Sequence, residues 1–132
     1  MKLLCSVLLL PLFFEGLLAQ CPAPAGLVNE QGEKLCARMY EHSNMYFDQS
    51  CNGKHFDVKD GDDVPYMPIL WNNRASSLVV ANRCTLKVWS VSGKGGNNRS
   101  FSSGVYYQLK DYINGLLGNW NDAISSYYCT CS

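Results

Sequence analysis

The chain has 132 residues, and its 11 Lys and Arg residues balance 11 Asp and Glu residues, so the formal net charge is zero. Nucleic-acid binders and polybasic lipid binders need a strong positive field, so this balance argues against both classes and we expect no nucleic-acid partner. The length fits one domain once a leader segment is set aside.

Residues 1–19 have the pattern of a secretory signal peptide. A lysine near the start precedes an apolar run, a Glu15-Gly16 break follows, and the small residue Ala19 ends the segment. The run is short and interrupted, which disfavours the alternative of an uncleaved membrane anchor. We expect one secreted domain over residues 20–132. No second apolar run of spanning length follows, so any membrane contact should be peripheral or made by an assembled form.

Six of the seven cysteines remain once Cys5 leaves with the leader. An even number in a small secreted chain predicts three disulfides, although spacing alone does not choose among the many pairings. A zinc site at Cys129 and Cys131 is the weaker alternative, because an oxidising compartment favours disulfides. The six residues are Cys21, Cys36, Cys51, Cys84, Cys129 and Cys131.

The rest of the chain consists of short β-branched and aromatic segments between turn-forming clusters, a pattern typical of strands. The clearest strands are residues 77–80 (SLVV) and 85–90 (TLKVWS). Turn clusters lie at residues 51–54, 60–63 and 92–98. We therefore expect an all-β fold built from Greek keys.

Acidic residues gather in and around the turn cluster at residues 60–63. The segment FDVKDGDDVPY at residues 56–66 contains Asp57, Asp60, Asp62 and Asp63. Glycine and proline mark it as a solvated loop. The functional alternative is a weak cation or partner patch.

Residues 104–117 are the one helical candidate. Leu109, Tyr112, Ile113 and Leu116 fall at helical spacing within this segment. We expect one or two helical turns there.

One sequence pattern occurs twice, as LWNNRASS at residues 70–77 and NWNDAISS at residues 119–126. Two copies of one unit of about fifty residues would each bury an incomplete face, and their pairing would close one core. We place the repeats at roughly residues 34–81 and 82–132. The tryptophans of the two copies are expected to pack at corners of the core.

The repeat is similar to the Greek-key motif of the βγ-crystallin superfamily. Both copies fit that superfamily's calcium-binding signature of two Asn/Asp positions, two variable positions, Ser/Thr and Ser. Over nearly all of residues 20–132 the chain also resembles the syncollin family, through SSLVVA at 76–81, VWS at 88–90 and the CTCS terminus at 129–132. The resemblance implies a single βγ-crystallin-like domain of two Greek-key motifs, stabilised by disulfides.

The resemblance also implies candidate calcium ligands. In crystallin-type pairs the Asn/Asp of one motif and the Ser of the other share an ion, which suggests Asn73 with Ser125 and Asp122 with Ser76, completed by backbone carbonyls. Calcium takes oxygen ligands, and only Asp122 brings a full charge, so we expect weak affinity. The alternative is structural, because Asn and Asp occupy turns and Ser hydrogen-bonds to local backbone. The residues alone leave both open.

Asn98 begins Asn98-Arg99-Ser100, an N-glycosylation acceptor pattern on a glycine-rich turn. In a secreted chain it is a candidate modification site, although such an acceptor pattern is not one that we expect as a feature of the family.

The sequence gives little support for catalysis. It has two histidines, His42 and His55, and neither a Gly-x-Ser-x-Gly elbow, a phosphate-binding loop nor a His-Glu-x-x-His motif. A nucleophilic cysteine is disfavoured because every remaining cysteine is expected to be paired. We expect no enzymatic activity, and calcium is the only candidate cofactor.

The family resemblance implies a protein of the secretory pathway. Such proteins lie in the lumen of secretory (zymogen) granules, peripheral on the lumenal face of the membrane, and contact granule lipids and lumenal granule-membrane glycoproteins. They form homo-oligomers and assist regulated exocytosis, and a pore-forming activity has been ascribed to them. The alternative is a soluble secreted binding module, lectin-like or antimicrobial. An enzyme-inhibitor role is a weaker alternative, because the glycine-rich loop at 92–98 lacks rigidity.

Overall fold

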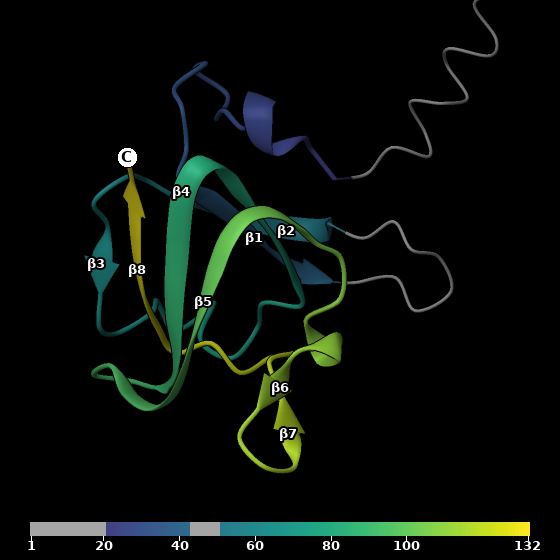
Figure 1. Ribbon diagram of the computed structural model, residues 1–132, viewed down its shortest axis with the longest axis vertical. Coiled ribbons are helices and arrows are strands. Elements are labelled where there is room, and N and C mark those ends of the chain that lie inside the picture. The colour runs from purple at the N-terminus through teal and green to yellow at the C-terminus, as the bar shows by residue number, and fades with distance from the viewer. Residues whose placement is uncertain (1–20, 43–50) are drawn as a thin grey trace, which may run out of the picture.

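The longest strand, β4 (Ser77–Val91), organises the fold (Figure 1). The computed structural model describes residues 21–42 and 51–132, so the expected signal peptide lies outside the described residues. Along one side β4 pairs with β5 (Gly95–Tyr106), and along the other it pairs first with β1 (Ala37–His42) and then with β8 (Ser126–Cys131). One strand therefore belongs to both halves of the chain.

The remaining elements extend this arrangement. The six-stranded sheet has the order β2-β1-β4-β8-β3 with β5 against β4, and all its pairings are antiparallel. A separate two-stranded ribbon, β6-β7, projects beyond the lower end of the sheet in Figure 1. The expected all-β fold is confirmed. The further elements are β2 (Asn52–Val58), β3 (Asp63–Val64), β6 (Ile113–Asn114), β7 (Gly118–Asn119) and the 3-10 helices η1 (Pro24–Gly26) and η2 (Leu109–Asp111).

The two short strands predicted at residues 77–80 and 85–90 are one bent strand. Arg83 has a positive φ of 64°, and the register with β5 shifts between Val80 and Thr85. The bend is a bulge rather than a chain reversal, and bulges increase the local twist of a strand. Strand β4 changes its partner from β1 to β8 at this bend, and so passes from one repeat to the other.

The helical expectation for residues 104–117 was right only for the single 3-10 turn η2. Leu109 in that turn is fully buried, whereas Ile113 and Leu116 are exposed, so the residues at helical spacing do not share a buried face. Gly115 has a φ of 74° and forms the loop of the β6-β7 hairpin. An Asn-Gly pair favours a hairpin, and here it outweighs the apolar spacing.

The core draws on both repeats. Its largest fully buried side chains include Trp120, Phe101 and Met39. On β8, Tyr127 is buried and Tyr128 is exposed, as the two-residue period of a strand predicts. Burial, followed by the nearby Asp62 carboxylate, raises the pKa of Tyr127 far above its usual range, so this hydroxyl is neutral at any physiological pH.

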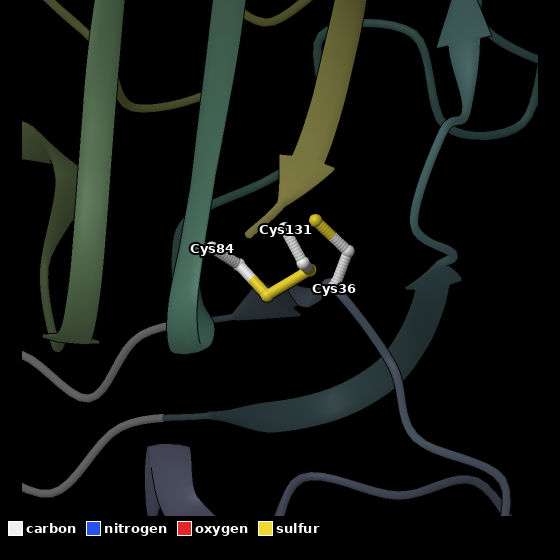
Figure 2. Close-up of side chains that lie close together, drawn as sticks. All are labelled: Cys36, Cys84 and Cys131. Atoms are coloured by element: carbon white, nitrogen blue, oxygen red, sulfur yellow. A yellow bond between two sulfur atoms is a disulfide. The ribbon is translucent and has the colours of Figure 1, made fainter.

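Three disulfides connect the described cysteines, which confirms the expected number. The pairs are Cys21–Cys51, Cys36–Cys129 and Cys84–Cys131. Figure 2 shows the Cys84–Cys131 disulfide beside the side chain of Cys36, and the sulfurs of these three cysteines are all within 4.8 Å of one another. These sulfurs are committed to disulfides and are not thiolate ligands, so the zinc alternative is not supported. Of these two neighbouring disulfides, one links the residue before β1 to β8, and the other links β4 to β8.

Removal of the Cys36–Cys129 disulfide is expected to destabilise the domain most. Closing its longer loop corresponds to about 4.7 kcal/mol of chain entropy, against about 3.7 kcal/mol for Cys21–Cys51. Denaturant unfolding of the double alanine variants of each pair measures the difference. Equal losses, or a larger loss for Cys21–Cys51, would contradict the prediction. A single Ser at Cys36 or Cys51 leaves an unpaired thiol and should reduce secretion.

Candidate functional site

The two copies of the repeated segment, residues 70–77 and 119–126, are the two corners of the fold, and they contact each other through matching backbone hydrogen bonds. Asn73 N donates to Ile124 O at 3.0 Å, and Asp122 N donates to Ala75 O at 2.9 Å. In the repeat alignment Asn73 corresponds to Asp122 and Ala75 to Ile124. Each corner therefore makes the same contact with the other, as an approximate twofold relation between the repeats requires.

The side chains continue the same reciprocity. Ser125 Oγ donates to Asn73 Oδ1 at 2.9 Å, and Ser76 Oγ donates to Asp122 Oδ1 at 3.1 Å. Both serines are buried, whereas Asn73 and Asp122 reach the surface. The structure thus brings together the two residue pairs that the calcium signature suggested.

Backbone conformation explains why the repeat carries Asn or Asp at this position. Asn73 has a φ of 59° and Asp122 a φ of 55°, both in the left-handed region. Asn and Asp occupy this region more readily than other residues with a Cβ. The signature therefore has a structural role at this corner whether or not an ion binds.

The second serine of each copy, Ser77 or Ser126, is fully buried and fixes a neighbouring loop. Ser77 Oγ accepts from Cys51 N at 3.1 Å, before β2. Ser126 Oγ accepts from Lys94 N at 3.2 Å and donates to Val91 O at 3.1 Å, in the β4-β5 turn. These serines tie the corners to the hairpins, so their hydroxyls are engaged in the fold.

The donor set at the corner suits calcium only weakly. Asp122 offers the single carboxylate of the two pairs, and Asn73, Ser76 and Ser125 offer neutral oxygens. Asn72, the residue before Asn73, carries a buried Oδ1 that has no hydrogen-bond partner in the described part of the chain. An unpartnered buried acceptor is uncommon and needs an explanation, and a cation is one. Sequence reasoning did not include Asn72 among the ligands, although it occupies the first position of the signature.

The two tryptophans of the repeat differ in exposure. Trp120 is fully buried, as expected of a corner-packing residue. Trp71 is half-buried and packs against Phe56, with ring centroids 5.5 Å apart. It also lines a surface pocket together with Glu41, Lys54, Leu70 and Arg74. Of the two corner tryptophans, Trp71 therefore lines this pocket, whereas Trp120 is buried in the core.

Three carboxylates of the acidic segment make hydrogen bonds or an ion pair within the fold. Asp60 accepts from Cys131 N at 2.9 Å, Asp62 accepts from Lys59 N at 2.8 Å, and Asp63 forms an ion pair with Lys94. Each of these carboxylates holds a turn or the sheet edge beside β8. The loop interpretation therefore accounts for these residues without a cation.

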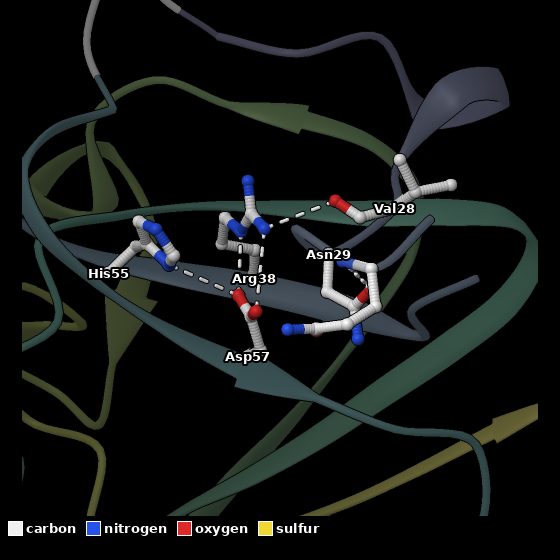
Figure 3. Close-up of polar contacts among 6 residues, drawn as sticks. Val28, Asn29, Arg38, His55 and Asp57 are labelled. Carbon is white, nitrogen blue, oxygen red and sulfur yellow. Dashed lines mark hydrogen bonds and ion pairs between the residues drawn. The ribbon is translucent and has the colours of Figure 1, made fainter. Parts of the chain in front are cut away.

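Asp57 belongs to a separate polar cluster (Figure 3). Arg38 Nε donates to Asp57 Oδ1 at 2.7 Å, and His55 Nδ1 lies 3.1 Å from the same oxygen. Arg38 Nη2 also donates to Val28 O at 3.2 Å. Burial opposes the charge on Arg38, but hydrogen bonds to Asp57 and Tyr40 outweigh it and raise the pKa of the guanidinium. The cluster fastens the N-terminal segment to β1 and β2.

Asn98 is exposed on β5, opposite Trp89 of β4. An exposed asparagine is what an acceptor site requires, so glycosylation at Asn98 stays a prediction.

A family model described as Syncollin matches residues 20–131 of the chain. The chain belongs to the syncollin family. It is 48% identical over 116 residues to syncollin of Rattus norvegicus, which covers 88% of this chain and 87% of the relative. It is 47% identical over 112 residues to syncollin of Homo sapiens, covering 85% and 84%.

Solved βγ-crystallin domains share the fold of this syncollin-family chain. An archaeal βγ-crystallin is 25% identical with a TM-score of 0.53 and covers 70% of this chain and 93% of its own. A structure described under the evolution of the eye lens βγ-crystallin domain fold has a TM-score of 0.60 at 18% identity, covering 85% and 93%. The Ca²⁺-bound domain of Abundant Perithecial Protein from Neurospora crassa has a TM-score of 0.53 at 17% identity, covering 73% and 88%. The expected βγ-crystallin-like fold is confirmed.

Two observations bear on the class of function. The syncollin family and the βγ-crystallin fold are non-enzymatic kinds of protein. Within residues 21–42 and 51–132, the structure contains no helix with the length and apolar character needed to cross a membrane.

Replacing Asn73 separates the two structural roles of its position. Asn73→Ala loses the hydrogen bond from Ser125, worth about 1 kcal/mol, and places a Cβ residue in the left-handed region at a cost of about 1 kcal/mol more. Asn73→Gly loses only the hydrogen bond, so it should be more stable than the alanine variant by about 1 kcal/mol. Denaturant unfolding without calcium measures both. An alanine variant as stable as the glycine variant would show that backbone conformation does not select the residue.

Proposed function

We propose that this syncollin-family protein is a secreted component of the lumen of secretory (zymogen) granules, peripheral on the lumenal face of their membrane, where it assists regulated exocytosis. The observation that carries the proposal is its 48% identity to rat syncollin over 88% of the chain. The signal-peptide pattern and the three disulfides support an oxidising secretory compartment.

The proposed partners are granule-membrane lipids, lumenal granule-membrane glycoproteins and further copies of the chain. A neutral domain has no strong field for anionic headgroups, so apolar contacts and self-assembly are the routes by which it would hold to a membrane. Pore formation, the further activity we propose, requires an oligomer, because unpaired backbone groups cannot enter lipid as single short strands. Homo-oligomerisation is therefore part of the proposal.

Weak calcium binding at the paired corners is also part of this proposal. Asp122 with Ser76 would hold one ion and Asn73 with Ser125 the other, with Asn72 Oδ1 as an added oxygen donor. The Neurospora crassa domain of the same fold was solved in a Ca²⁺-bound form, which supports the idea at the level of the fold. A bound ion would supply positive charge that joins the two repeats.

A soluble lectin-like or antimicrobial module is the second candidate function. It is favoured by the surface pocket beside Trp71, which is lined also by Lys54, Arg74 and Glu41. An indole ring offers an apolar face, and cations beside it attract acidic groups, so the pocket suits an anionic sugar.

The first test is flotation of the oxidised mature protein with vesicles of granule-like lipid, combined with dye leakage. The granule-membrane role predicts that the protein floats with the vesicles, and an assembled form should release dye. Fractionation of secretory granules checks the location, with enrichment in the membrane fraction expected. Failure to float at any protein concentration would contradict the proposal and favour the soluble module, for which binding to a glycan array is the matching measurement.

Calcium titration followed by the thermal midpoint tests the ion. Wild-type protein should rise in midpoint with calcium and return with chelator. Asp122→Asn keeps a side-chain oxygen and a residue that tolerates the left-handed conformation, but it loses the charge and should lose most of the shift. Asn73→Asp gains a carboxylate at the corresponding position and should increase the shift. No calcium-dependent change in either the wild type or Asn73→Asp would mean that the corners are structural only.

A further inference from the structure

The tip of the β6-β7 hairpin exposes apolar side chains that the fold does not use. Leu116 is 95% exposed and Leu117 96% exposed, and Ile113 on the adjoining strand is 71% exposed. In Figure 1 the hairpin projects from the lower end of the sheet, away from the body of the domain. Contiguous exposed apolar side chains of this kind mark an interaction site or a liability for aggregation.

The turn itself does not require these leucines. Asn114 pairs with Gly118, so residues 115–117 form the loop, and the positive φ is taken by Gly115. A Cβ at Gly115 would also lie 2.8 Å from Asn97 Nδ2, so the Asn97 side chain would have to shift. The conformation at the tip is therefore set by Gly115, and polar residues would serve the turn as well at the two positions that follow.

The hairpin is anchored to the domain at its base. Trp120 is buried in the core, and its N donates to Tyr112 O at 3.0 Å. Asn97 Nδ2 of β5 donates to Asn114 Oδ1 at 3.0 Å. These contacts hold the apolar tip at a fixed place relative to the sheet, so presenting it costs little ordering entropy on binding.

The hairpin carries no charged side chain. Residues 112–121 (YINGLLGNWN) contain no Asp, Glu, Lys or Arg, and the charged residues next to this segment are Lys110 and Asp111 before it and Asp122 after it. Charged groups are the ones that resist transfer from water into an apolar medium. The tip can therefore leave water without desolvating a charge of its own.

We propose that the Leu116-Leu117 tip inserts into the interfacial and outer hydrocarbon region of a lipid membrane, and so is the part of the molecule that makes the membrane contact. This inference rests on the proposed membrane association. A second copy of the chain is the less suitable occupant, because a stable protein interface buries about 800 Å² on each partner and a two-leucine tip supplies far less. Lipid needs no matching surface, and side chains enter it one by one.

The charge distribution adds a specific requirement. The chain is neutral overall and the tip is uncharged, so attraction to anionic lipid contributes little. Binding should then be similar on phosphatidylcholine vesicles and on vesicles that also contain phosphatidylserine. It should also persist when salt is raised from about 0.1 M to about 1 M, which screens electrostatic attraction.

The experiment compares vesicle flotation of the wild type, Leu116→Ser/Leu117→Ser and the control Ile69→Ser/Val91→Ser. The control removes two other exposed aliphatic side chains, with 90% and 53% exposure, neither of which belongs to the hairpin or lines the pocket beside Trp71. Burial of each leucine corresponds to roughly a tenfold gain in affinity, so the hairpin variant should bind about a hundredfold more weakly. The control should bind as the wild type does or lose less, and both variants should keep the wild-type thermal midpoint because the replaced side chains are exposed.

A second variant reports depth directly. Leu117→Trp should bind vesicles and show tryptophan emission that is quenched by brominated acyl chains more strongly than the wild-type emission. Wild-type flotation with undiminished flotation of the hairpin variant would overturn the insertion while leaving the membrane role intact. So would a loss confined to the Ile69/Val91 variant, an unquenched Leu117→Trp that still floats, or binding that needs anionic lipid and disappears in salt. No flotation of the wild type would overturn the membrane role, and the inference with it.

Discussion

The reciprocal contact between the two corners is the constraint on which the rest of the structure depends. Asn73 and Asp122 each take a left-handed backbone conformation, and each bonds through both backbone and side chain to the opposite repeat. Because neither repeat can complete these bonds alone, the corners order only when the halves are together. The buried serines that follow, Ser77 and Ser126, then position the loops leading to neighbouring strands. Strand β4 crosses between the halves, so the contact also fixes the sheet.

Much of this arrangement could be predicted from the sequence, because the repeat contains residues that favour specific backbone conformations. The same alignment that pairs Asn73 with Asp122 also relates Tyr40 to Trp89, whose carbonyls accept from Ser76 N and Ser125 N. Three disulfides followed from the number of cysteines and the leader. Their pairing did not, because it depends on which strands become neighbours, and β8 pairs with β4 only in the folded sheet.

Failures of prediction occurred where local signals competed. Apolar spacing at residues 104–117 favoured a helix. In the structure the first residues of this segment belong to the edge strand β5, and its last residues form a hairpin around an Asn-Gly turn. Residues 77–80 and 85–90 were predicted as two strands where the structure has one, because the bulge at Arg83, a positive φ inside a strand, leaves no mark in composition. Asn72 could have been included among the candidate ligands from its place in the signature, but its unpartnered oxygen is visible only in three dimensions.

The two repeats agree at the corners and differ at the surface, and this division separates fold from function. The backbone conformation at the corners selects the residue types there, so a match to the signature does not by itself assign an ion. The segments that precede the two corners in the chain are not under this backbone constraint. One leads to Trp71 beside a pocket with charged walls, and the other forms the uncharged hairpin with Leu116 and Leu117 at its tip. A duplicated unit needs neither feature to close its core, so the partners of this protein are to be sought where the copies differ.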